Sequence, residues 1–184
     1  MRITFTFFLV AIFGLSATKA QTFQWAKQLG GISSQKGTSV VVDGDGNVYS
    51  TGYFYDTTDF DPGVGVFHLT SNATFGAAYI SKLDAVGNFV WAKKVQTNSQ
   101  TWAWGIALDQ NNNVYVTGQF AGTGDFDPGA GTFNMTAAYG AQIFVLKLDA
   151  AGEFVWAKNF ITNGLSSSCQ ARRRTTCIGD CDRI

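Results

Sequence analysis

Phe89-Val90-Trp91-Ala92-Lys93 is the stretch that decides the fold, because it is the middle one of three copies of a single motif. The other two copies are Phe23-Gln24-Trp25-Ala26-Lys27 and Phe154-Val155-Trp156-Ala157-Lys158, at spacings of 66 and then 65 residues. Self-similarity at one period marks a tandem-repeat architecture, in which each unit buries its apolar faces against its neighbours. The sequence therefore predicts a chain of like units.

Three further landmarks recur with the motif. They are Asn47-Val48-Tyr49 with Asn113-Val114-Tyr115, the pentapeptide DFDPG at 59–63 and 125–129, and Lys82-Leu83-Asp84 with Lys147-Leu148-Asp149. The first two keep a spacing of 66 and the last has 65, which places a single deletion in the loop after the DPG turn. We assign residues 21–88 to a first repeat, 89–153 to a second and 154–164 to the start of a third.

Within each repeat, apolar residues alternate or form short runs between Gly, Asn and Asp, which is typical of strands and turns. We predict strands at 25–29, 38–42, 47–54 and 77–83, then at 91–95, 103–108, 113–120 and 142–148, with an extra hairpin strand at 66–69 and 132–135. Strands such as Val40-Val41-Val42 are apolar on both sides and need a partner sheet on each face. Stacked blades of a β-propeller provide this arrangement.

The predicted fold class is all-β: tandem four-stranded antiparallel blades of a β-propeller, about two blades plus the first strand of a third. A β-sandwich is the competing fold, but it does not by itself require near-identical sequence in successive sheets. A closed propeller takes at least four blades, so we expect either a fragment of a propeller or a ring that several chains complete together.

The pattern D-x-x-G-N-V-Y-x-T-G, followed by K-L-D-x-x-G-x-x-x-W-A-K, resembles the bacterial β-propeller repeat called SBBP. It lies at 43–52 with 82–93 and, with Asn112 in place of a glycine, at 109–118 with 147–158. The DFDPG insertion resembles the variant found in exported proteins of the Bacteroidetes group. The resemblance covers most of the chain after the first twenty residues and implies a surface or secreted repeat protein.

The first twenty residues have the pattern of a secretory signal peptide. Arg2 precedes a thirteen-residue apolar run from Ile3 to Leu15, and a small residue, Ala20, precedes the expected cleavage before Gln21. A run of this length is short for a membrane span, and no second apolar run of membrane length follows. We expect a secreted or cell-surface protein without a membrane span.

The composition changes near Gly164. Residues 21–164 hold seven lysines, no arginine, eleven acidic residues and no cysteine, a formal net charge of −4. Residues 165–184 hold four arginines, all three cysteines and no aromatic residue. We interpret this end as an atypical, disordered or foreign tail. The negative main part gives no field that favours nucleic acid, so we expect no nucleic-acid partner.

Catalytic sets are not evident in the sequence. The one histidine, His68, has Asn134 at its place in the second repeat, so it is not required by the unit. We expect a non-catalytic interaction or scaffold module without a cofactor, either by itself or as a fragment of a larger surface protein. The alternative is part of a secreted propeller enzyme or carbohydrate-binding protein whose site needs further blades. The expected partners are other blades, copies of the chain, or an extracellular protein or glycan.

Two groups of side chains are candidate binding residues. Oxygen ligands at alternate positions suit calcium, and the candidates are Asp43, Asp45, Asn47, Asp59, Asp61, Asp125 and Asp127. Aspartates at turns also cap backbone amides, and we expect that role. Trp102 and Trp104 lie on the same side of one strand, where they can stack on a sugar ring or fill a blade interface. For this pair, packing is the expected role.

Overall fold

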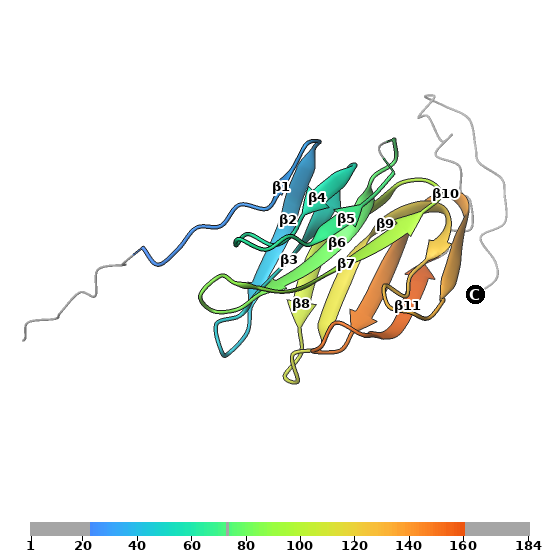
Figure 1. Cartoon of the computed structure of the whole chain (residues 1–184). Helices are drawn as coiled ribbons and strands as arrows, with labels where there is room; N and C mark the ends of the chain where they lie inside the picture. The colour runs from blue at the N-terminus through green and yellow to red at the C-terminus, as the bar shows by residue number, and fades with distance from the viewer. Residues whose placement is uncertain (1–22, 73, 161–184) are drawn as a thin grey trace, which may run out of the picture.

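The computed structural model describes residues 23–72 and 74–160, which form eleven β-strands and no helix (Figure 1). The strands are β1 (Gly30–Gly31), β2 (Gln35–Val42), β3 (Val48–Phe54), β4 (Thr57–Asp59), β5 (His68–Thr70), β6 (Ala77–Leu83), β7 (Phe89–Thr97), β8 (Thr101–Leu108), β9 (Val114–Asp125), β10 (Asn134–Leu148) and β11 (Phe154–Phe160). All paired strands are antiparallel. The all-β prediction is confirmed.

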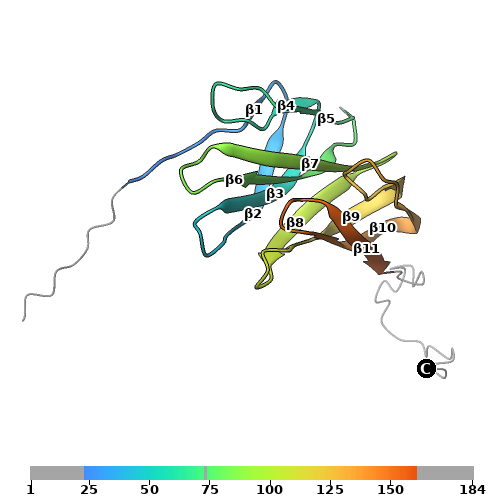
Figure 2. The ribbon, with the colours of Figure 1, turned by 60° about the horizontal axis from the view of Figure 1, so that its bottom comes forward.

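Two antiparallel meanders make up the described part of the chain. Strands β2, β3, β6 and β7 pair in that order and form the N-terminal sheet; β8, β9, β10 and β11 form the C-terminal sheet. Gln96 and Thr97, at the end of β7, pair with Asp125 and Gly124 of β9, so one hydrogen-bonded path runs through both sheets. The sheets can be followed as the blue-to-green and yellow-to-red halves of the ribbon (Figure 2).

The Trp-Ala-Lys motif forms the outer strand of each sheet. β7 pairs with β6, and β11 pairs with β10, so each copy completes the sheet that precedes it in sequence. The residues expected to open a third unit, 154–160, therefore close the C-terminal sheet. The predicted strand at 25–29 is wrong, because within the described residues no strand equivalent to β6 precedes it. Of the described residues before β2, only those of β1 pair with another strand, and their partner is β4. This pairing is equivalent to the one between the end of β7 and β9.

The extra hairpin differs between the repeats. In the first repeat it is the separate pair β4 and β5, closed by a contact of 3.0 Å between the hydroxyls of Thr57 and Thr70. In the second repeat the same hairpin is continuous with β9 and β10, and the equivalent hydroxyls of Thr123 and Thr136 are 2.9 Å apart. The predicted break between 132–135 and 142–148 is an irregularity inside one long strand. The expected signal peptide and tail lie outside the described residues.

The larger hydrophobic core lies between the two sheets. Tyr49, Ile80 and Val95 of the N-terminal sheet are buried in one cluster with side chains of the C-terminal sheet, among them Phe120 and Leu146. A smaller cluster around Phe54, Phe60, Ala77, Tyr79 and Ala92 fills the other side of the N-terminal sheet. Both faces of this sheet are thus apolar, as the sequence predicts for stacked sheets.

Candidate functional site

An aspartate holds the turn between the first two strands of each sheet. Asp43 Oδ1 accepts backbone N–H groups from Asp45 at 3.0 Å and Asn47 at 2.9 Å, and Oδ2 accepts Asn47 Nδ2 at 2.8 Å. The Tyr49 hydroxyl also donates to Oδ2, at 3.3 Å. Asp109 repeats all four contacts at distances between 2.8 and 3.3 Å. Such carboxylates are constituents of the turn.

These contacts favour the charged form of the aspartates. The side-chain hydrogen bond from Asn113 is the largest influence on the pKa of Asp109. Partial burial acts to raise this pKa, but the hydrogen bonds outweigh it and lower the pKa to about 2. Partial burial acts to raise the pKa of Asp43, but the hydrogen bonds from Asn47 and its neighbours outweigh it and lower the pKa. The Lys147 ammonium lies 3.6 Å from Asp109 Oδ2, and its pKa is raised chiefly by its contact with the Tyr115 hydroxyl.

The DFDPG loops use their carboxylates in the same way. Asp59 Oδ1 accepts the N–H of Phe67 at 2.9 Å and of Asp61 at 3.0 Å, and these bonds lower the pKa of Asp59. Asp61 Oδ1 accepts the N–H of Gly63 at 2.8 Å. Asp125 and Asp127 make the equivalent bonds at 2.8 to 2.9 Å. The proline turn is therefore fixed at both ends by carboxylate acceptors.

The candidate calcium ligands come together only in small local groups. Asp43 lies with Asn47, Asp59 with Asp61, and each group accepts or makes hydrogen bonds inside its own loop. Within residues 23–72 and 74–160, no three His, Cys, Asp or Glu side chains gather where a metal ion would sit. Calcium binding stays a prediction, and these contacts show the structural role that the aspartates perform without it.

Trp102 and Trp104 belong to an aromatic cluster at the junction of the sheets. The Trp102 ring stacks on Tyr53 of the N-terminal sheet, with centroids 5.3 Å apart and planes 29° apart. Trp104 meets Trp102 edge-on at 5.9 Å and remains 43% exposed. Trp102 Nε1 is buried without a hydrogen-bond partner. Trp102 thus packs between sheets, whereas Trp104 keeps an accessible ring, and ligand stacking by the pair stays a prediction.

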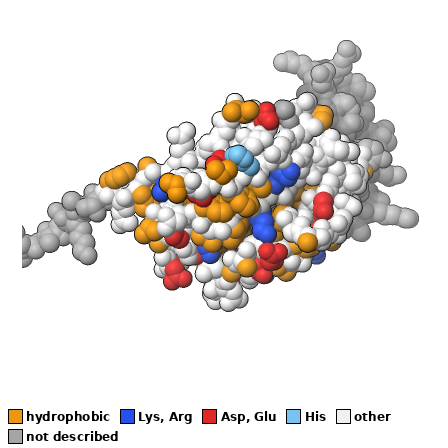
Figure 3. Space-filling view, viewed as in Figure 1, with side chains coloured by type: hydrophobic (Ala, Val, Ile, Leu, Met, Phe, Trp, Pro, Cys, Tyr) orange, Lys and Arg blue, Asp and Glu red, His pale blue; other side chains and the backbone are white. Residues whose placement is uncertain are grey.

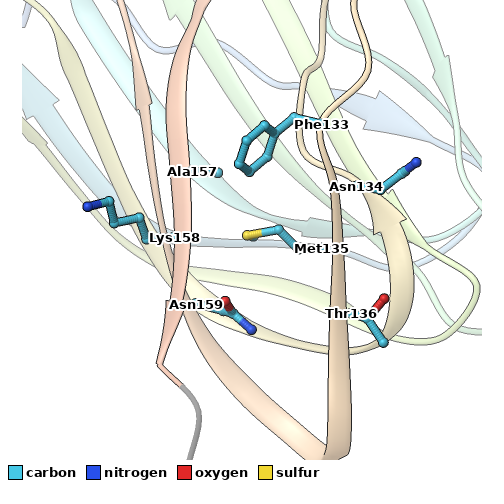
Figure 4. Close-up of a pocket in the computed structure, with 7 residues that line it drawn as sticks. All are labelled: Phe133, Asn134, Met135, Thr136, Ala157, Lys158 and Asn159. Carbon is cyan, nitrogen blue, oxygen red and sulfur yellow. The ribbon is translucent and has the colours of Figure 1, made fainter.

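A hollow of about 470 Å³ lies between the start of β10 and β11, and sequence reasoning did not find it. Figure 4 shows Phe133 and Met135 on one side of it and Ala157, Lys158 and Asn159 on the other. In the first repeat, Lys94 closes the equivalent gap by donating to the Thr70 carbonyl at 2.6 Å. Asn159 replaces this lysine in the second repeat, and it bonds the buried Gln142 at 2.8 Å instead. The replacement of Lys94 by Asn159 was the sequence difference that could have predicted this hollow.

The face of the C-terminal sheet turned away from the N-terminal sheet is open; we call it the C-terminal outer face. Its members are Ala107, Tyr115, Thr117, Ile143 and Val145. Most of them line, with Gly105, a hollow of about 250 Å³. Their equivalents in the N-terminal sheet include Tyr49, Thr51, Ala78 and Ile80, which are all fully buried beneath the C-terminal sheet. This outer face therefore repeats the one that the N-terminal sheet buries.

The opposite end of the described chain is also open, at the N-terminal outer face, which consists of Val40, Val42, Val48 and Ser50. Val40 is 63% and Val42 56% exposed, beside a hollow of about 330 Å³. Their equivalents in β8, Ile106 and Leu108, pack against the core between the sheets. Other hydrophobic side chains also reach the surface, as the view in Figure 3 shows.

These features define a class of protein: an all-β repeat protein whose four-stranded antiparallel sheets pack face to face, as the blades of a β-propeller do. The family model of the SBBP β-propeller repeat matches residues 24–53 and 95–119, so the chain carries repeats of this family. Each matched segment contains the whole first strand of a sheet and part of the second. The resemblance to the SBBP repeat is confirmed, whereas the resemblance of the DFDPG insertion to a Bacteroidetes variant and the surface or secreted setting stay predictions.

One curated relative is similar to part of the chain. The chain is 34% identical over 98 residues to the uncharacterized WD repeat-containing protein L264 of Acanthamoeba polyphaga mimivirus. The match covers 52% of this chain and 7% of the relative, so the chain spans a small part of that protein's length. The repeat family and this relative together support a repeat scaffold or interaction module. Among the described residues, no helix has the length and apolar character that a membrane crossing needs.

Proposed function

We propose that this protein is an exported, non-catalytic scaffold whose β-propeller blades present their faces to other blades or to extracellular proteins. One observation carries the proposal: both outer faces keep most of the apolar positions that are buried where the two sheets meet, with Ser50 and Ser81 of the N-terminal sheet as exceptions. Val42 is 56% exposed although its equivalent, Leu108, packs in the core, and Ile143 is 54% exposed although Ala78 is fully buried. Exposed apolar patches of this kind mark interaction sites.

The hydrogen bonding supports a structural role for the polar residues. Asp43, Asp59, Asp109 and Asp125 each accept at least two hydrogen bonds from their own loops. A catalytic carboxylate needs a free oxygen directed at a substrate, together with a second group that moves a proton. The repeated aspartates are used instead to set the turns.

Export rests on the sequence pattern before Gln21. The test is expression with the native leader in a bacterial host, followed by fractionation and mass determination of the chain. We expect the chain outside the cytoplasm, with Gln21 as its first residue. An unprocessed chain retained in the cytoplasm would contradict the exported role.

The interaction role is tested with a photo-crosslinking residue at Thr117, which is exposed on the C-terminal outer face. The control position is Val90 of β7, which is 45% exposed, as is its equivalent Val155. Val155 lies on the side of its sheet that packs on the other sheet, and Val90 lies on the side that does not. Their equal exposure shows that stacking of a sheet does not cover this position. We expect crosslinked protein from Thr117 and not from Val90. Equal yields from both positions would contradict a specific face.

A second candidate function is glycan stacking at Trp104, supported by its accessible ring beside Trp102. Because Trp102 packs on Tyr53, only Trp104 offers a free ring face or edge. The Trp104→Ala variant should then lose binding on a glycan array while its unfolding midpoint stays close to that of the wild type. Absence of binding by the wild-type chain would remove this candidate.

A further inference from the structure

The two outer faces are the two halves of an interface that the chain already contains once. Where the sheets meet, Ile106 and Leu108 of β8 pack against the core cluster that contains the buried Tyr49 and Ile80. The N-terminal outer face offers Val40 and Val42 at the positions of the first pair. The C-terminal outer face offers Tyr115 and Val145 at the positions of the second pair. Each half is complementary to the half at the other end of the molecule.

We propose that a second copy of this chain docks head to tail, its N-terminal outer face against the C-terminal outer face of the first. This inference rests on the proposed function and deepens it by naming the partner and the contact. The strand register supports it, because Thr117 pairs with Val145 as Thr51 pairs with Ile80. The docked copy therefore meets a surface with the same strand spacing as the internal interface.

The exposed fractions show which side chains the second copy covers. Ile143 is 54% exposed where Ala78 is 0%, and Phe160 is 58% exposed where Val95 is 1%. Covering such side chains removes apolar surface from water and favours association. The two hollows, of about 250 and 330 Å³, are the spaces into which the facing side chains would fit.

The N-terminal copy of the motif has to move when a second copy docks. Trp25 lies over the turn at 84–87 and donates its Nε1 hydrogen to the Ala85 carbonyl at 3.0 Å. Trp91 of β7 lies over the equivalent turn at Gly152. Residues 23–29 thus stand where a preceding outer strand would be, which is the place that β11 of the first copy holds. β11 is hydrogen-bonded to β10 and residues 23–29 pair with no strand, so residues 23–29 are displaced.

Head-to-tail contacts between identical chains close into a ring when the rotation between copies allows it. Because the described residues of each copy supply two sheets and propellers have about four to eight blades, rings of roughly two to four copies are expected. A contact of this kind uses a different surface from each partner, which makes it testable with pairs of variants.

The experiment measures mass by light scattering after size exclusion, over a range of protein concentrations. A reducing agent is present so that Cys169, Cys177 and Cys181 cannot crosslink the chains. We expect the purified wild-type chain to form a discrete oligomer. Val42→Glu and Ile143→Glu should each weaken association by about a hundredfold, because a carboxylate would enter an apolar contact. Val90→Glu is the matched control and should leave the mass unchanged.

A mixture of Val42→Glu and Ile143→Glu chains distinguishes the proposed contact from symmetric pairing of like faces. One variant keeps its C-terminal outer face and the other its N-terminal outer face, so the mixture should form one-to-one pairs. The Trp25→Ala variant should associate more tightly than the wild type, because it lacks the Trp25–Ala85 hydrogen bond that holds residues 23–29 on the docking face. Failure of the mixture to pair, or weaker association of Trp25→Ala, would overturn the arrangement.

A wild-type chain that stays monomeric up to about 100 μM would overturn self-docking. The proposed scaffold role would survive that result if the crosslinker at Thr117 still captured a different protein. If the crosslinker captured nothing and the chain were monomeric, both proposals would fail. The two measurements therefore separate a wrong partner from a wrong function.

Discussion

The N-terminal and C-terminal sheets share a repeat, but one pair of positions in the middle strands differs in polarity. Ser50 and Ser81 of the N-terminal sheet are hydrogen-bonded to each other at 2.8 Å. Val116 and Leu146 occupy these positions in the C-terminal sheet, where both are buried between the sheets. The two serines lie instead on the side of the N-terminal sheet turned away from the C-terminal sheet. The N-terminal sheet is therefore more polar at these two positions than the buried face that it repeats.

The largest expected effect comes from removing the central ring of each sheet. Phe120 is fully buried, 4.8 Å from Phe126, and Phe54 is fully buried, 5.3 Å from Phe60. Phe120→Ala and Phe54→Ala should each lower the free energy of unfolding by about 3 to 5 kcal/mol. Because β7 joins the sheets by pairing with β9, both variants should still unfold in one step in urea. Tryptophan fluorescence and far-ultraviolet circular dichroism report this, and non-coincident transitions would show independent sheets.

The polar pair gives the next largest difference. Val116→Ser should cost about 2 to 3 kcal/mol, because it removes buried methyl groups and buries a hydroxyl. Ser50→Val should cost only about 1 kcal/mol, mainly by leaving the buried Ser81 hydroxyl without its partner. Urea unfolding of both variants measures the difference. Equal losses of stability would mean that position 50 on the N-terminal outer face and position 116 between the sheets are equivalent environments.

Two glycines compare the tryptophan contacts of the sheets. Gly87 and Gly152 have φ of 82° and 85°, which favours glycine. A Cβ at Gly152 would lie 3.0 Å from the ring of Trp91, which is held in β7. At Gly87 it would lie 3.0 Å from the exposed Lys27 side chain and 3.1 Å from the Trp25 ring, and these two residues belong to no strand and can shift more easily. Gly152→Ala should cost about 2 kcal/mol and Gly87→Ala about 1 kcal/mol. Thermal unfolding can rank them, and the reverse order would contradict the packing argument.

The smallest effect concerns acid sensitivity of the turns. The pKa of Asp109 is about 2 in the folded chain, below the value of about 3.9 for an unfolded chain. Its contribution to stability is therefore complete above about pH 4 and is lost as the pH falls toward about 2. Asp109→Asn should flatten the pH dependence of the unfolding midpoint in this range more than Asp43→Asn, because the side-chain hydrogen bond from Asn113 is the leading influence on the pKa of Asp109, whereas partial burial is the leading influence on Asp43 and opposes the lowering. Unfolding midpoints between pH 6 and 2 measure this, and identical slopes would contradict it.

Much of the fold could be predicted from periodicity alone. Alternating residues in 47–54 and 77–83 predict β3 and β6 within a residue or so, since turns such as Asp43 to Asn47 limit them. The error at 25–29 arose because a strand needs a partner, and sequence spacing does not say whether a motif pairs backward or forward. For the same reason, the pairing of the end of β7 with β9 could not be predicted from the sequence.

The candidate site was less predictable. Asp43 and Asp59 could be assigned to turns from their sequence context, and the hydrogen bonds agree. The stacking of Trp102 on Tyr53 could not be foreseen, since their rings meet across a contact between sheets. The exposure of Val42 depends on what covers it, which no single repeat encodes.

The outer strand of each sheet is encoded at the beginning of the next sequence unit, since β7 completes the sheet of β6 and β11 that of β10. In the protein made from such a gene, the first strand of each new repeat would therefore be hydrogen-bonded to the last strand of the repeat before it. Because the period is constant to within one residue, a duplication begun at any point preserves these pairings. Arrays of this kind can lengthen or shorten by recombination without the evolution of a new junction.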